Sequence, residues 1–310
     1  MLTFQRSGRH WAIIRARRFW GVFTLLTALT AAATAYAQSE PAASRGFIWK
    51  AMRGQGAVYL VGSLHMLTRA YYPLGPALES AFTESDILVE EIDLGVLLAP
   101  ESQMQLLTRS LLPGNQLLDY VVSDETYERV IDRIAKLGLP LEPLRRFKPW
   151  GLALTLLALE WQTAGFDQSL GLDQHFYDRA RREGKAVQAL ETLEFQISRF
   201  DGMTNEEQDR LLAETLSEFD TQIAAVTELA NAWRDGDADT VEQIVLRDLR
   251  KEPRLYESLL VDRNRDWLPA IEALFTRPRP AFVVVGAAHL VGQDGLVAML
   301  ESRGYNVEQR

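Results

Sequence analysis

The sequence contains no cysteine among its 310 residues. Disulfides, thiolate metal ligands, a cysteine nucleophile and a lipid anchor on a modified cysteine are therefore excluded. Basic residues are the minority of the charged ones, with 33 Lys and Arg against 42 Asp and Glu. An acidic chain is repelled by phosphates and anionic headgroups, so neither nucleic acid nor an anionic membrane surface is an expected partner.

Histidine is scarce as well, and two of the four histidines occupy the same place in a repeated pattern. Residues 57–65 and 281–289 each hold an apolar, mostly β-branched run followed by Gly-x-x-His. Such a run predicts a buried strand that ends at the glycine and leaves the histidine in the exit loop. Open α/β sheets bind ligands at the carboxyl ends of their strands. We therefore expect His65 and His289 to meet in one site.

A carboxylate completes this predicted site. A further strand is expected over residues 86–94, and it ends in the acidic cluster Glu90, Glu91 and Asp93. Strand alternation would place Glu91 and Asp93 on one face and Glu90 on the other. A His/His/Glu set suits Zn²⁺, Mn²⁺ or Co²⁺ with an open position for a water, which the metal would activate for hydrolysis. The alternative is that the acidic cluster is only a solvated strand end.

An export signal is predicted over residues 1–37. Five arginines without an acidic residue precede an apolar run from Phe19 to Ala33, and Ala35-Tyr36-Ala37 matches a small-x-small cleavage site. The run is short for a bilayer span, so we expect cleavage near Ala37 and no stable membrane insertion afterwards; an uncleaved anchor is the alternative. The mature protein would be periplasmic or secreted. It would keep 28 basic against 42 acidic residues, a net charge of −14.

The remaining chain predicts a tether over residues 38–46 and a single α/β domain over residues 47–310. Two strands flank Gly54-Gln55-Gly56 as a hairpin, and short strands are expected at residues 185–190 and 305–308. Helical patterns fill most of residues 100–275, including an apolar core helix at 149–161 and a helix divided near Pro269. The expected architecture is a mixed central sheet with a large helical middle section that covers the strand ends.

Several blocks of the chain together resemble one family. These are Gly62-Ser63-Leu64-His65, Leu88-Val89-Glu90-Glu91-Ile92-Asp93, Gly171-Leu172-Asp173, Lys185 to Gln196, Arg263 to Trp267, and Gly286 to Gly292. They resemble the TraB/PrgY/GumN family, which is related to the Tiki membrane metalloproteases. The likeness extends from about Phe47 to the C-terminus. Unlike the Tiki proteins, the chain ends in polar residues rather than a membrane helix.

The resemblance implies a fold similar to that of erythromycin esterase and the haem-binding lipoprotein ChaN. It also implies a divalent-metal peptidase site at His65, Glu91 and His289. In addition, it places Glu191, Gln196 and Arg263 in the same cleft. Glu191 would then be a further acid or ligand, and the other two would orient the substrate.

The expected function is an exported divalent-metal-dependent hydrolase that cleaves a peptide or amide bond with a metal-activated water. Its partner would be a peptide or small-molecule substrate. One alternative is a binding protein that holds a peptide, or haem through an axial histidine, without turnover. Another is metal-free hydrolysis, with a histidine and Glu91 as an acid–base pair in the manner of erythromycin esterase. A serine-triad esterase is not expected, because no Gly-x-Ser-x-Gly motif accompanies the histidines.

Overall fold

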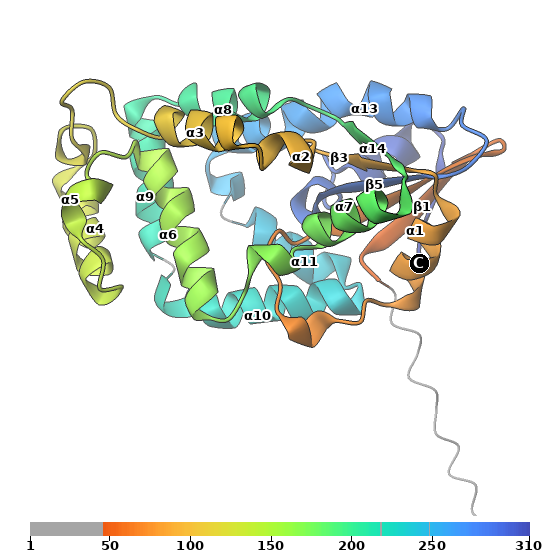
Figure 1. The fold of residues 1–310 in the computed structure, drawn as a ribbon, viewed down its shortest axis with the longest axis horizontal. Coiled ribbons are helices and arrows are strands. Elements are labelled where there is room, and N and C mark those ends of the chain that lie inside the picture. The colour runs from red at the N-terminus through yellow and green to blue at the C-terminus, as the bar shows by residue number, and fades with distance from the viewer. Residues whose placement is uncertain (1–45, 218, 248) are drawn as a thin grey trace, which may run out of the picture. The chain divides into compact units, whose positions relative to one another are not determined.

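A six-stranded sheet carries the strand ends on which the predicted site depends (Figure 1). The computed structural model describes residues 46–217, 219–247 and 249–310, so the predicted export signal and nearly all of the tether lie outside the described residues. The described residues belong to one unit, Pro41–Arg310. The strand order is β4-β3-β5-β2-β1-β6. The strands are β1 Ile48–Arg53, β2 Gly56–Ser63, β3 Ile87–Glu90, β4 Ala186–Ala189, β5 Ala281–Gly286 and β6 Asn306–Gln309.

The register brings the two Gly-x-x-His segments to the same edge. Strands β4, β3, β5 and β2 are parallel neighbours, whereas β1 pairs antiparallel with both β2 and β6. Ser63 at the end of β2 pairs with Gly286 at the end of β5, and β3 flanks β5 on its other side. Central parallel strands are covered on both faces, which explains their nearly continuous apolar sequence. The predicted hairpin, mixed sheet and α/β class are confirmed.

Helices pack against this sheet through aromatic and aliphatic side chains. On α1 (Pro76–Glu84) and α7 (Leu172–Glu183), Phe82 and Phe176 place their rings 5.3 and 4.6 Å from the ring of Phe282 on β5. Helix α13 (Asp262–Leu274) contacts β2. Outside the helical middle section, the other elements include α10 Phe219–Asp235, α11 Ala238–Leu246, α14 Leu296–Ser302 and the 3-10 turns η1 Arg69–Tyr71, η3 Gln168–Leu170, η4 Leu249–Lys251 and η6 Ala287–His289.

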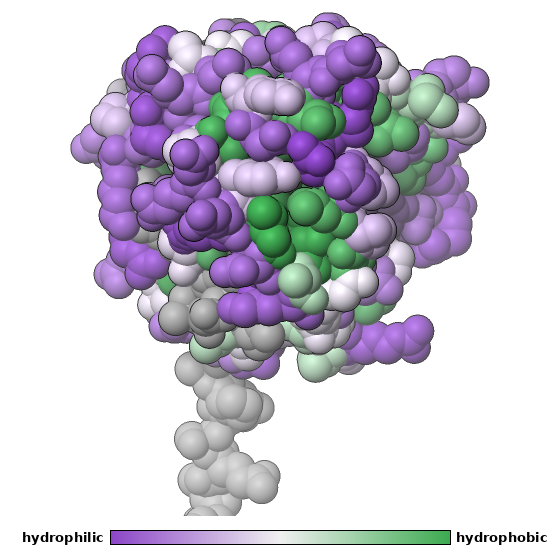
Figure 2. All heavy atoms as spheres, turned by 90° about the vertical axis from the view of Figure 1, so that its left-hand side faces the viewer, coloured by the Kyte–Doolittle hydropathy of each residue, from purple (hydrophilic) through white to green (hydrophobic). Residues whose placement is uncertain are grey.

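The helical middle section has a core of its own. It comprises α3 Pro100–Arg109, η2 Leu118–Tyr120, α4 Asp124–Lys136, α5 Leu141–Leu144, α6 Pro149–Thr163, α8 Leu193–Asp201 and α9 Asn205–Ser217. Buried residues of α4, α6 and α9 pack together, including Ile134, Leu156 and Leu212. The face seen in Figure 2 is mostly hydrophilic, with hydrophobic residues gathered near its centre and toward its upper right. Among the described residues, no helix is both long and apolar enough to cross a bilayer. Helix α6 is instead largely buried, as the sequence predicts.

The strand predicted over residues 86–94 is too long, because β3 stops at Glu90. Asp93 is the N-cap of the short helix α2 (Leu94–Leu97), and its side chain accepts a hydrogen bond of 2.8 Å from the backbone of Gly95. This cap stabilises the start of α2, so the chain turns after β3 instead of continuing as a strand. The predicted alternation of Glu90, Glu91 and Asp93 therefore does not apply beyond the first of them.

The division predicted near Pro269 is also wrong. Helix α13 continues through Pro269, and the irregular turn lies earlier, where the π-helical segment Glu257–Val261 separates α12 (Pro253–Tyr256) from α13. A proline removes a single backbone donor from a helix. Here Trp267 and Ile271 on either side of Pro269 are buried in the core, and their packing holds the helix together.

Substitution of Gly62 tests how closely the strand ends are packed. A Cβ atom at this position would lie 2.3 Å from Cδ1 of the buried Phe47 ring and 3.1 Å from Cα of Ala287. We expect Gly62→Ala to lower the free energy of unfolding in urea by about 1–3 kcal/mol, because the core must shift. Gly75→Ala is the control: a Cβ there meets nothing within 4 Å, and only a weaker helix cap, about 1 kcal/mol or less, is at stake. Equal losses in both variants would contradict this packing.

Candidate functional site

A pocket of about 370 Å³ opens at the carboxyl edge of β2, β3 and β5. Its polar lining includes Ser63, His65, Glu90, Glu91, Asp173, Gln174 and Gln196. Its apolar lining includes Met66, Leu94, Leu97, Leu98, Leu154 and Ala158. A pocket of this size, apolar with a few convergent polar groups, suits a small ligand or one part of a larger one.

His65 lies in the loop after β2 and is the exposed imidazole of the site, with 61% of its side chain accessible. Its Nδ1 lies 3.1 Å from Oδ2 of Asp173, near the start of α7, while the hydroxyl of Ser63 donates to Oδ1 of the same carboxylate at 3.1 Å. Asp173 raises the pKa of His65 to about 9. Helix α7 can begin this close because Gly171 has no Cβ: one built there would lie 2.3 Å from the carbonyl oxygen of His65.

Three predicted residues converge around Gly286. A Cβ atom at this glycine would lie 3.3 Å from Oε1 of Glu91, 3.6 Å from Cδ2 of His289 and 3.7 Å from Nε2 of His65. Oε1 of Glu91 and Nε2 of His65 are therefore at most about 7 Å apart. The absence of a side chain at Gly286 leaves space between an imidazole and a carboxylate. The structure thus brings His65, Glu91 and His289 together.

Arg263 on α13 connects the residues on the buried side of the site by hydrogen bonds. A guanidinium has five N–H donors, and all five have acceptors here. The Nε and Nη2 groups donate to Glu191, Nη2 also donates to Oε2 of Glu91 at 2.5 Å, and Nη1 donates to the carbonyl of Leu259 and to Nε2 of His289. Arg263 is 7% exposed and does not line the pocket. In this arrangement it has no donor left for a substrate.

Two short hydrogen bonds fix Glu91, and Gln196 adds a longer one. The backbone N–H of Gly286 donates to Oε1 at 2.6 Å, and Arg263 donates to Oε2. Burial alone would raise the pKa of this carboxyl, but Arg263, the protonated His65 and the backbone N–H of Gly286 outweigh it and lower the pKa to about 2. Glu91 is therefore an ionised carboxylate throughout the neutral range.

His289 is the buried counterpart of His65. The amide of Asn264 donates to the carbonyls of His289 and Asp294, which leaves Oδ1 of Asn264 to accept from Nδ1–H of His289 at 2.7 Å. Nε2 of His289 accepts from Arg263 at 3.1 Å. Burial, together with Arg263, lowers the pKa of His289 to about 3, although Glu91 opposes this shift. His289 is therefore neutral, and both ring nitrogens are occupied.

Glu191 and Gln196 extend the network from the end of β4. The carboxylate of Glu191 accepts hydrogen bonds from Arg263 and from the indole of Trp267, while burial raises its pKa. Gln196 on α8 donates to Glu191 at 3.1 Å and to Glu91 at 3.4 Å. Of the three residues predicted to contact substrate, Gln196 lines the pocket, whereas Glu191 and Arg263 lie behind it.

The arrangement does not fit a divalent cation held by His65, Glu91 and His289. Neither nitrogen of His289 is free to coordinate, and the guanidinium of Arg263 places a positive charge beside Glu91. Among the described residues, no group of three or more His, Asp or Glu side chains could hold a metal ion. Metal binding at these residues stays a prediction, and it would require Arg263 and His289 to move.

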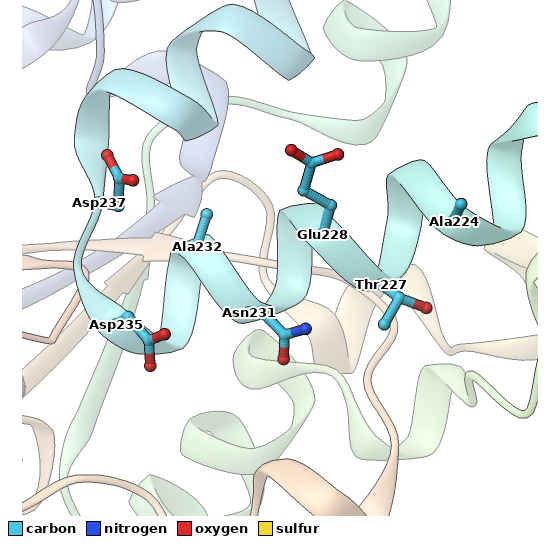
Figure 3. A pocket seen from close by; sticks show the side chains of 7 residues that line it. All are labelled: Ala224, Thr227, Glu228, Asn231, Ala232, Asp235 and Asp237. Atoms are coloured by element: carbon cyan, nitrogen blue, oxygen red, sulfur yellow. The ribbon is translucent and has the colours of Figure 1, made fainter.

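A second hollow, of about 710 Å³, lies along α10 and its C-terminal end. Figure 3 shows that its labelled side chains point in different directions: Thr227, Asn231 and Asp235 lie on one side of the helix, and Glu228 on the other. The hollow contains no histidine and none of the predicted site residues. Its larger volume therefore does not make it the candidate site.

Comparison with known proteins gives the same assignment as the motifs. The family model described as the TraB/PrgY/gumN family matches residues 47–309. The chain belongs to this family. Proteins named uncharacterized protein YbaP, from Escherichia coli (strain K12) and Shigella flexneri, are each 26% identical to it over 268 residues, which cover 84% of this chain and 96% of each relative. No solved structure matches.

The sequence did not indicate every residue that organises this TraB/PrgY/gumN site. Asp173 orients His65, Asn264 orients His289, and Gly286 leaves the space between them. Each belongs to a block that resembles the family, so the signal was present. Their roles depend on contacts between distant elements, which a motif alone does not specify.

Removal of Arg263 should test the buried network. In Arg263→Leu, Glu91 and Glu191 would be buried without a cation, and we expect a loss of about 3–5 kcal/mol in the free energy of unfolding at neutral pH. Arg265→Leu is the matched control, because that side chain is 57% exposed and pairs at the surface; about 1 kcal/mol or less is expected.

The loss of stability in Arg263→Leu should also depend on pH in a defined direction. The folded-state pKa of Glu91, about 2, lies below its ordinary value of 4.5, so its pairing stabilises the wild type above pH 4.5 and is lost as the pH falls toward 2. Without Arg263, burial raises this pKa instead. The deficit of Arg263→Leu should therefore shrink from pH 7 to pH 5 in urea titrations. A deficit that is small at pH 7, or independent of pH, would contradict the network.

Proposed function

We propose that the protein is a hydrolase of peptide or amide bonds in which His65 and Glu91 form the acid–base pair. One observation carries the proposal: an exposed imidazole faces a buried carboxylate across the side-chain-free position Gly286, on the lining of a pocket. At neutral pH the pKa values keep His65 protonated and Glu91 ionised. Two titratable groups whose environments separate their protonation states are the usual arrangement for acid–base catalysis.

The proposed reaction consumes one water. Glu91 accepts a proton from the water as its oxygen attacks the carbonyl carbon, and Nε2–H of His65 gives a proton to the leaving nitrogen as the C–N bond breaks. The proton that Glu91 took from the water then passes through a second water to His65, which restores both groups. Arg263 makes Glu91 a weak base, so the reaction relies on fixed positions and on the acid. Asp173 orients His65, and Arg263 with the backbone of Gly286 orients Glu91.

No step of this reaction uses the metal ion predicted from the sequence, because the ring nitrogens of His289 are hydrogen-bonded to Asn264 and Arg263. Binding of a peptide or haem without turnover is the other candidate, and it is supported by the open side of His65. Export to the periplasm or beyond is part of the proposal and rests on the N-terminal sequence alone.

Substitution of the pair should abolish peptide hydrolysis. We expect Glu91→Gln and His65→Gln each to lower kcat/KM for peptides found by library cleavage by at least ~100-fold, with folding checked by circular dichroism. Glu101→Gln, an exposed site on α3, is the control. A chelator should change the wild-type rate less than ~2-fold if His65 and Glu91 suffice. Loss of activity in the chelator, with recovery on adding Mn²⁺, would instead establish the metal-dependent reaction.

The pH profile should report His65. The proposed acid is lost as the pH rises through the pKa of His65, so kcat/KM should fall above about pH 9. Asp173 is the main cause of the raised pKa, so Asp173→Asn should move this alkaline limb toward the ordinary value of 6.5. Initial rates measured between pH 6 and pH 10 check this. An unchanged limb in Asp173→Asn would remove His65 from the role of acid.

A further inference from the structure

Glu90, the last residue of β3, has a buried carboxyl group without a partner. The residue is 2% exposed and lines the pocket that contains His65 and Glu91. Neither carboxyl oxygen has a hydrogen-bond partner at bonding distance, and the nearby backbone N–H of Leu94 only partly offsets the effect of burial on its pKa. Native proteins pair nearly all of their buried polar side-chain atoms, so an orphaned carboxyl group that faces a pocket requires an explanation. Nothing in the reaction proposed above uses Glu90.

The surroundings of Glu90 specify the charge of the missing partner. Its acidic neighbours are Asp173, Asp93 and Glu91. The nearby cations are already engaged, since His65 pairs with Asp173 and Arg263 with Glu91. Burial and these acidic neighbours raise the pKa of Glu90 to about 9, so its carboxyl is neutral at neutral pH while no ligand is bound. The acidic neighbours would repel an anionic ligand group, whereas a cationic group would be attracted and would favour the ionised form of Glu90. A metal ion is the less suitable cation, because no three acidic or imidazole groups of the described residues converge enough to hold one.

Much of the remaining pocket lining is aliphatic. Leu98 on the segment after α2 and Leu154 on α6 are 48% and 40% exposed, and both line the pocket with Leu94 and Leu97. An apolar ligand group laid against them would remove this area from water and so gain free energy of binding. The ligand therefore combines a cationic nitrogen with an aliphatic group.

We propose that Glu90 binds the ammonium group of the substrate, and that the ligand class is a peptide with a free N-terminal amine and an aliphatic first residue. The amine pairs with Glu90, and the aliphatic side chain lies against Leu98 and Leu154. Cleavage of such a ligand rests on the proposed function, but its recognition does not. Glu90 is thus a specificity-determining residue.

Binding of two small probes to the mature chain tests this inference. Because the proposed reaction would cleave the amide of a bound probe, each titration is repeated in Glu91→Gln, which the proposed function makes inactive. L-leucinamide has a free amine, and N-acetyl-L-leucinamide lacks it. Titration calorimetry should give a Kd for L-leucinamide at least ~10-fold lower than that for the acetylated probe. Glu90→Gln should remove this difference, whereas Glu101→Gln should keep it. Equal Kd values in the wild type, no binding of either probe, or an undiminished preference in Glu90→Gln would each overturn the inference.

Controls for folding and for the proposed function keep the outcomes distinct. Glu90→Gln should melt at the same or a higher temperature, because it replaces an unpaired buried carboxyl group; if it does not fold, Glu90→Leu takes its place in the titration. If Glu90→Gln still hydrolyses N-acetylated peptides, the proposed hydrolase function is retained. L-leucinamide bound through Glu90 by a protein that cleaves no peptide would retain the inference and remove the proposed hydrolase.

Discussion

The candidate site depends on one buried guanidinium. Arg263 on α13 joins the ends of β3 and β4, the turn that carries His289 and the π-helical segment Glu257–Val261, because each of its five N–H groups has an acceptor on one of these elements. Burying this cation and two carboxylates carries a large desolvation penalty, which only complete pairing offsets. The network is therefore all-or-none: a partly paired version would be less stable than an apolar core. This requirement fixes Glu91 in one position, and any chemistry at Glu91 inherits that rigidity.

The repeated Gly-x-x-His motif produces two histidines with opposite properties. Their strands are parallel neighbours in register, so the backbone delivers both imidazoles to the same edge. The surroundings of each ring then decide its charge. The carboxylate of Asp173 favours the protonated form of the exposed His65, whereas burial favours the neutral form of His289, whose Nδ1 is bonded to the neutral amide of Asn264. Pseudo-symmetry of the backbone thus coexists with functional asymmetry in the site.

Sequence reasoning reached the fold and the meeting of three residues because both follow from local rules. Apolar runs that end in glycine specify buried strands, and parallel strands share one edge. The errors arose where tertiary contacts override a local pattern. The capping hydrogen bond of Asp93 ends β3 early, and buried neighbours carry α13 through Pro269. Arg263 illustrates the same limit. A family block predicts that it lies near the site, but only the acceptors around it reveal that all its donors point inward.

Glu90 and Glu91 are adjacent in the chain, yet the fold treats them in opposite ways. Arg263 and the backbone N–H of Gly286 donate to Glu91, while Glu90 is buried beside other acids with no cation to pair with. An apolar residue at position 90 would satisfy the sheet better. Local rules of folding are broken mainly where function requires it. The fixed carboxylate is suited to chemistry on a bond, whereas the unpaired one is suited to a ligand that supplies the missing charge. The pair therefore separates reaction from recognition within two residues of one strand.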